Sequence, residues 1–184
     1  NELNMKYLIH SLTIFRVLFA PLIFCLILIF ESFALALIIF VLASITDFFD
    51  GFLARKYKLT STLGEILDPI ADKILVLFLV ISLCIYLNSF YIGICGSLIL
   101  SREFWVGALR DLNARNRNTE ATQVTLMAKF KTTSQFITFS GYLLALTMNN
   151  SLMIFISHFF LFLTLIITLQ TGLSYTVSSF KSVK

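Results

Sequence analysis

Apolar residues fill six long stretches of the chain, and short polar breaks separate them. The stretches lie at about residues 8–30, 33–54, 67–88, 90–110, 122–148 and 152–176. Each has roughly the 20 residues that a helix needs to cross the apolar core of a bilayer. No linker, low-complexity segment or internal repeat interrupts them. The pattern therefore predicts an all-α membrane protein with six transmembrane helices, in which residues 1–184 form a single integral membrane domain.

The basic residues gather toward one end of the predicted helices. The turns near residues 31–32, 88–89 and 148–151 contain no Lys or Arg, whereas the opposite loops and flanks, at 1–7, 55–66, 111–121 and 177–184, carry eight of the 14. The other six lie in the inner parts of the helices. Loops rich in Lys and Arg stay on the cytoplasmic side of a membrane. We therefore expect both termini to be cytoplasmic.

The composition supports a membrane protein and argues against soluble classes. Apolar residue types make up 58% of the chain and charged types 13%, whereas about a quarter of an ordinary globular protein is charged. The formal net charge of +4 does not indicate nucleic-acid binding, because no soluble basic face is available to present it. We expect no cleavable signal peptide, because no small-residue cleavage site follows the first apolar stretch. The cysteines lie in apolar stretches and are expected to be packed side chains: Cys25, Cys84 and Cys95.

The acidic residues are as one-sided as the basic ones. Of the ten, only Glu31 belongs to the outer side, and the other nine lie inside or in the inner half of the predicted helices. A charge within a membrane helix is costly and usually faces a water-filled cavity. The sequence therefore predicts a polar cavity that opens to the cytoplasm.

Four aspartates in the second and third predicted helices are the main candidates for chemistry. Asp47 and Asp50 are three residues apart, and Asp68 and Asp72 are four apart, so each pair shares one helix face. Four carboxylates that converge in one cavity repel each other and need cations. Oxygen ligands without nearby histidine or cysteine suit Mg²⁺ or Mn²⁺, and two such ions can bind a diphosphate. The alternative is that some of them cap helices, most plausibly Asp68 before Pro69.

Small residues and one arginine accompany the first aspartate pair. Gly51 and Ala54 carry no bulky side chain, so a substrate can approach the helix backbone closely there. Arg55, at the end of the same predicted helix, is placed to reach a phosphate.

Residues 47–72 resemble the signature of the CDP-alcohol phosphotransferases, D-x-x-D-G-x-x-A-R followed by G-x-x-x-D-x-x-x-D. Members of that family are similar in having six transmembrane helices and a dinuclear metal site that faces the cytoplasm, and they displace CMP from a CDP-linked lipid with an alcohol. The resemblance implies that the four aspartates hold two divalent cations and that Asp72 is the general base. It also implies that the CDP group lies along a second set of fixed positions: Gly51, Ala54, Arg55 and Gly64. A base within reach helps because an alcohol is a poor nucleophile at neutral pH.

Flanking segments are similar to one branch of this family, the phosphatidylglycerophosphate synthases. They are residues 13–16, 101–110 and 129–135. In the first of these segments, the resemblance adds Thr13 and Arg16 to the CDP-lipid site. The sequence departs from that branch at His10, where an asparagine is expected. The other histidine, His158, is predicted to be a packed side chain in the outer half of the sixth helix.

Four cations at the inner ends of the fourth and fifth predicted helices point to a phosphorylated acceptor: Arg102, Arg110, Lys129 and Lys131. A neutral alcohol would not need them. The alternatives are that they anchor the helices at the membrane surface, or that Arg102 pairs with its neighbour Glu103. Lys129 and Lys131 point roughly 200° apart on an ideal helix, so a regular helix brings only one of them to the site.

The sequence therefore favours a transfer from CDP-diacylglycerol to glycerol 3-phosphate, in a bacterial-type cell membrane. Alternatives within the family are phosphatidylinositol-phosphate, phosphatidylserine and cardiolipin synthases. A cation transporter is the main alternative from another class, but the acidic residues lie at the inner face, and no repeated pair of broken helices is present. A membrane scaffold would leave the spacing of the aspartates unexplained. The resemblance also implies a homodimer.

Overall fold

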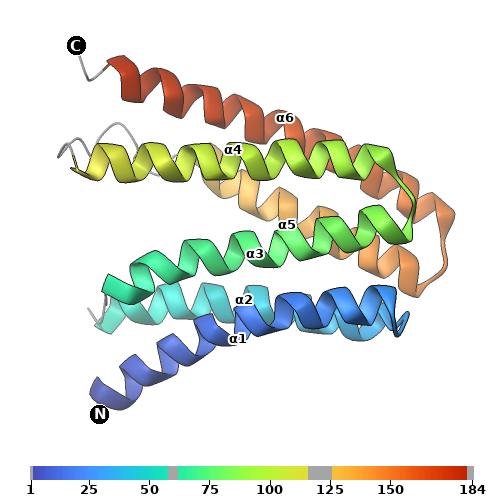
Figure 1. Ribbon diagram of the computed structural model, residues 1–184, viewed down its shortest axis with the longest axis horizontal. Coiled ribbons are helices and arrows are strands. Elements are labelled where there is room, and N and C mark those ends of the chain that lie inside the picture. The colour runs from blue at the N-terminus through green and yellow to red at the C-terminus, as the bar shows by residue number, and fades with distance from the viewer. Residues whose placement is uncertain (1, 58–61, 116–125, 182–184) are drawn as a thin grey trace.

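The computed structural model describes residues 2–57, 62–115 and 126–181, and within these ranges it describes the side chains of 14–46, 67, 69–115 and 130–180. The described backbone forms six α-helices and contains no strand. The helices are α1 (Glu2–Leu28), α2 (Phe33–Tyr57), α3 (Thr62–Tyr86), α4 (Phe90–Arg115), α5 (Leu126–Thr147) and α6 (Ser151–Lys181). The all-α prediction is confirmed (Figure 1).

The start of α3 differs from the predicted one. The helix begins at Thr62 rather than near residue 67, so Pro69 lies inside it and Asp68 cannot be its N-cap. The capping alternative for Asp68 was therefore wrong. A proline removes one N–H donor and restricts the residue before it, yet the turn ahead of Pro69 remains helical, so the proline does not set the start of α3.

Three tight turns connect the helices at one end of the bundle, where the sequence predicted polar breaks. Each turn contains a residue in the left-handed region: Glu31 (φ 48°), Asn88 (φ 44°) and Asn149 (φ 47°). Asparagine adopts this conformation more readily than most residues and ends a helix well. Asn150 caps the start of α6: its side-chain oxygen accepts a hydrogen bond from the backbone N–H of Leu152 at 3.0 Å.

The helices pack around one apolar core. α1 packs against α2 and α3, α4 packs against α3 and α6, and α5 packs against α2 and α6. Gly96 lets α4 approach α3 closely, since a Cβ at that position would overlap Val80 Cγ1. Every helix contributes buried side chains to this core, among them Ile23, Ile27, Phe40, Leu79, Leu83, Ile92, Ile99, Phe139, Leu143 and Leu161.

The outer faces of the bundle suit a bilayer. In the described part of the chain, three segments are long and apolar enough to cross a membrane: Pro69–Tyr86, Phe90–Arg115 and Ser151–Phe180. Two shorter apolar helical segments, Ile14–Leu28 and Phe33–Thr46, accompany them. Large apolar side chains are exposed on all six helices, as lipid contact requires. The chain thus fits a membrane protein, whereas six membrane crossings stay a prediction.

The start of α1 and the end of α6 lie at the same end of the bundle, opposite the three short turns (Figure 1). This arrangement agrees with the prediction that both termini share one side of the membrane. That this side is the cytoplasmic one stays a prediction.

Candidate active site

A cavity of about 580 Å³ opens between α3, α4, α5 and α6. Its walls come from the first half of α3, the second half of α4, the start of α5 and the second half of α6, which all lie away from the three short turns. Charged residues of both signs line it: Asp72, Lys73, Arg102, Glu103, Arg110, Asp111 and Lys131. The structure therefore brings Asp72 together with three of the four cations that the sequence assigned to the acceptor.

Asp72 is held in the cavity wall by an arginine from α1. The Arg16 Nη1 group donates a hydrogen bond to Asp72 Oδ1 at 2.7 Å. Arg16 is almost completely buried, with 1% of its side chain exposed, whereas 48% of the Asp72 side chain is exposed. A buried cation needs a partner, and this ion pair supplies one while it joins α1 to α3. The carboxylate keeps its exposed side toward the cavity, within reach of a substrate.

The other residues of the predicted metal and CDP sites have side chains outside the described residues. The backbone nevertheless places Asp47 and Asp50 within α2 and Asp68 and Asp72 within α3. Their spacings therefore fall on regular helices, and each pair shares a helix face. That the two pairs meet around metal ions stays a prediction. The same holds for the roles of the remaining residues in these sites: Thr13, Gly51, Ala54, Arg55 and Gly64.

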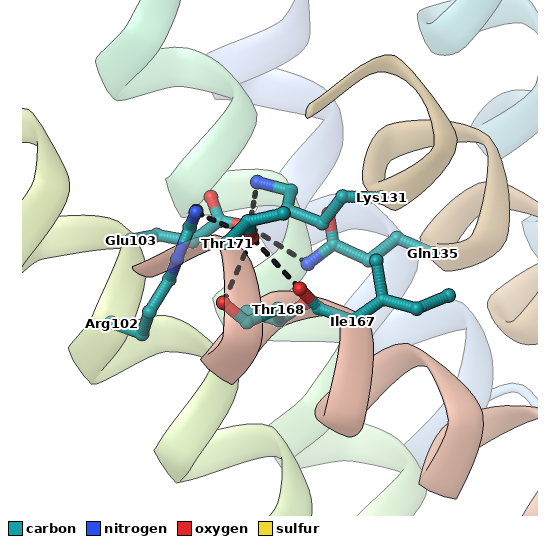
Figure 2. Close-up of polar contacts among 7 residues, drawn as sticks. All are labelled: Arg102, Glu103, Lys131, Gln135, Ile167, Thr168 and Thr171. Carbon is teal, nitrogen blue, oxygen red and sulfur yellow. Dashed lines mark hydrogen bonds and ion pairs between the residues drawn. The ribbon is translucent and has the colours of Figure 1, made fainter. Parts of the chain in front are cut away.

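Lys131 is fixed in the cavity wall by Glu103, which also accepts a hydrogen bond from Gln135. Its Nζ donates to Glu103 Oε1 at 2.8 Å, and Gln135 Nε2 donates to the same oxygen at 2.8 Å (Figure 2). The side chains of Lys131 and Glu103 are each 13% exposed. A buried carboxylate with two donors is satisfied, and it holds Lys131 at one position across α4 and α5. The side chain of Lys129 lies outside the described residues.

Arg102 has a different partner from the one considered for it. Its Nη2 group donates to Thr171 Oγ1 on α6 at 2.7 Å, while Glu103 pairs with Lys131 instead. The Arg102–Glu103 ion pair was therefore wrong. Successive residues on a helix point roughly 100° apart and do not face each other. Arg110 is the most exposed of the three described cations, and its guanidinium lies over the ring of Tyr175.

Sequence reasoning missed several residues of the cavity. Lys73 lies with its Nζ 5.1 Å from the centre of the Phe104 ring, and Gly107 leaves space for it, since a Cβ there would lie 2.7 Å from this nitrogen. Asp111 and Tyr175 also line the cavity. Lys73 follows Asp72 directly, so its position was a usable signal. The sequence contains no signal for Tyr175, because this residue lies in an apolar stretch.

His158 lies away from this cavity and is a packed side chain, as predicted. Its ring stacks on Tyr91, with centroids 5.3 Å apart, and meets the edge of Tyr142 at 5.4 Å. Its Nδ1 lies 2.8 Å from the backbone oxygen of Ile154, one turn earlier in α6. These contacts indicate that His158 has a packing role rather than a catalytic one.

Comparison with known proteins gives consistent matches. A family model described as CDP-alcohol phosphatidyltransferase matches residues 8–170. A Rickettsia typhi protein named CDP-diacylglycerol–glycerol-3-phosphate 3-phosphatidyltransferase is 40% identical over 176 residues, which cover 93% of this chain and 96% of the relative. Proteins with the same name from Wigglesworthia glossinidia brevipalpis and Escherichia coli K12 are 39% and 36% identical, and each alignment covers 68% of this chain and 70% of the relative.

The Glu103–Lys131 pair predicts a measurable loss of stability. Glu103→Gln removes the negative charge and leaves Lys131 as a buried cation without a counterion, which should cost about 1.5–3 kcal/mol. We expect a lower thermal unfolding temperature for the purified protein in detergent. Asp111→Asn is the matched control, because it removes the same charge from the same helix at an exposed position. Equal unfolding temperatures for Glu103→Gln and the parent protein would contradict this role.

Proposed function

Because this chain belongs to the CDP-alcohol phosphatidyltransferase family, we propose that it transfers the phosphatidyl group of CDP-diacylglycerol to glycerol 3-phosphate and releases CMP. The product would be phosphatidylglycerophosphate, a precursor of phosphatidylglycerol. The names of its relatives support this acceptor. The observation that carries the proposal is the cavity that unites Asp72 with Arg102, Arg110 and Lys131.

The reaction needs a base next to a bound alcohol. The free hydroxyl of the acceptor attacks the phosphorus that carries the diacylglycerol. A new oxygen–phosphorus bond forms, the anhydride bond to CMP breaks, and CMP leaves with the bonding electrons. Asp72 takes the hydroxyl proton in this proposal, as its half-exposed carboxylate in the cavity wall permits. Arg16 orients that carboxylate from its buried side.

Two divalent cations, Mg²⁺ or Mn²⁺, would be held by Asp47, Asp50, Asp68 and Asp72. When bound, they neutralise the diphosphate and the departing CMP. Asp72, whose side chain is described, fits this use. Its carboxylate lines the cavity with 48% of the side chain exposed, and it supplies oxygen atoms, the ligands that these ions prefer. Gly51, Ala54, Arg55, Gly64 and Thr13 would complete the CDP-lipid site.

The acceptor phosphate would bind on the opposite wall of the cavity. Metal ions that already hold a diphosphate cannot also neutralise a second dianion, so side chains must do it. Arg110 is exposed, and its planar guanidinium can bind a phosphate through two parallel hydrogen bonds. Lys131 and Arg102 add charge from fixed positions. Lys129 is a further candidate from the sequence. We also propose a homodimer in a bacterial cell membrane, with both termini cytoplasmic.

The acceptor assignment predicts a selective change in kinetics. Arg110→Ala and Lys131→Ala should each raise the KM for glycerol 3-phosphate, while the KM for CDP-diacylglycerol changes much less. A hydrogen bond to a charged group contributes roughly 1.5–3 kcal/mol, so the effect should be about tenfold or more. The measurement is steady-state kinetics with each substrate varied in turn. Unchanged KM values in both folded variants would remove the support for a phosphorylated acceptor.

The metal proposal predicts that activity depends on divalent cations. Removal of these ions by a chelator should abolish transfer, and Mg²⁺ or Mn²⁺ should restore it, because the proposed ligands are all carboxylate oxygens. CMP release from CDP-diacylglycerol is the readout. The unfolding temperature, measured in parallel, separates lost chemistry from lost folding. Full turnover in excess chelator would contradict the proposal.

A further inference from the structure

The second half of α6 approaches the two cavity arginines of α4 through three buried residues. They are Thr171, Gly172 and Tyr175, which lie just beyond residue 170, where the family match ends. Residues four apart share a helix face, so Thr171 and Tyr175 project the same way. Thr171 accepts a hydrogen bond from Arg102, Gly172 lies beside the Arg102 side chain, and the ring of Tyr175 lies near the guanidinium groups of both arginines.

Thr171 presents an oriented acceptor to Arg102. Its hydroxyl lies 2.8 Å from the backbone oxygen of Ile167 and 3.0 Å from that of Thr168 (Figure 2). A hydroxyl has one proton to donate, and it is used on these carbonyl groups. The oxygen therefore accepts the hydrogen bond from Arg102 Nη2 at 2.7 Å. This arrangement fixes the guanidinium rather than leaving it to rotate.

Gly172 provides the space in which the Arg102 side chain lies. A Cβ at position 172 would be 2.8 Å from Arg102 Cγ and 2.9 Å from its Nε. Real side chains do not tolerate such contacts, so any other residue would move the arginine away from α6. The absence of a side chain at this position thus selects the path of Arg102 toward the cavity.

Tyr175 lies beside both arginines. The guanidinium carbon of Arg110 is 5.4 Å from the centre of its ring, and that of Arg102 is 6.0 Å away. Cations within about 6 Å of an aromatic ring centre are attracted to its face. The ring is buried and lines the cavity. Its attraction for both guanidinium groups offsets part of the repulsion between these two like charges.

We propose that Thr171, Gly172 and Tyr175 are positioning residues that preorganise Arg102 and Arg110 for the phosphate of the acceptor. The inference rests on the proposed function, because it needs a phosphorylated acceptor in this cavity. It assigns the affinity for that acceptor in part to α6, an apolar helix that carries none of the aspartate motif. Small displacements of such groups lower catalytic efficiency strongly.

The test compares variants that remove the contact of Thr171 or Tyr175 with the arginines and variants that keep this contact. Thr171→Val removes the acceptor at nearly constant volume, and Thr171→Ser restores it. Tyr175→Leu removes the ring, and Tyr175→Phe keeps it. Thr176→Val is the matched control: the Thr176 hydroxyl also donates to a backbone oxygen of α6, that of Gly172, and accepts from α4, but its donor is Trp105 Nε1 at 3.0 Å.

We expect Thr171→Val and Tyr175→Leu to raise the KM for glycerol 3-phosphate about three- to tenfold. The KM for CDP-diacylglycerol and the kcat should change less than about twofold, since these residues act before the chemical step. Thr171→Ser, Tyr175→Phe and Thr176→Val should stay near the parent values. Gly172→Ala should resemble Thr171→Val, because both release Arg102 from α6.

Combined variants show whether the effect passes through the arginines. In an Arg102→Ala background, Thr171→Val should add nothing, whereas Tyr175→Leu should still act through Arg110. Additive effects of Thr171→Val and Arg102→Ala would overturn the inference. So would unchanged acceptor KM values in Thr171→Val and Tyr175→Leu, provided that Arg102→Ala and Arg110→Ala raise that KM. If neither arginine variant alters the KM, the acceptor site in the proposed function is itself wrong, and the inference falls with it.

Discussion

Charged side chains buried among apolar helices need partners, and this requirement organises the polar end of the bundle. Arg16 on α1 bonds Asp72 on α3, Lys131 on α5 bonds Glu103 on α4, and Arg102 on α4 bonds Thr171 on α6. Each contact joins two different helices at this end of the bundle. An ion left without its partner in such a place costs several kcal/mol, about 3–5 when the pair is fully buried. The contacts that specify the packing of this end are therefore also the contacts that shape the cavity.

The charged residues of the cavity therefore differ in how firmly they are held and in how exposed they are. Asp72 bonds Arg16 and lines the cavity with a half-exposed side chain, an arrangement that is compatible with the proposed acceptance of a proton. Lys131 and Arg102 are held in place by their partners, while Arg110 remains exposed. A site with fixed cations has already met the cost of bringing like charges together before a substrate arrives. The proposed acceptor phosphate would enter such a prepared environment.

Much of this arrangement was predictable from the sequence, because it depends on local spacing. The lengths of the apolar stretches predicted the six helices, and the turns at Glu31, Asn88 and Asn149 fell where polar residues interrupt them. The sequence also grouped three of the four cations that line the cavity, Arg102, Arg110 and Lys131, and their binding of the acceptor stays a prediction. The partners of these cations were not predictable, since they depend on which helix faces cross. Arg102 therefore seemed closest to Glu103, its neighbour in sequence, although the fold gives Glu103 to Lys131. The position of Tyr175 in the cavity was not predictable, because an aromatic residue in a membrane helix usually indicates lipid contact or packing.

In the proposed function, the cations of this cavity select a phosphorylated alcohol as the acceptor. The most direct test measures kcat/KM with glycerol 3-phosphate and with glycerol, which lacks the phosphate, for the parent protein and for Arg110→Ala. We expect the parent to prefer glycerol 3-phosphate strongly and the variant to reduce this preference about tenfold, through a loss that affects only the phosphorylated acceptor. An equal loss with both acceptors, or an unchanged preference, would contradict it.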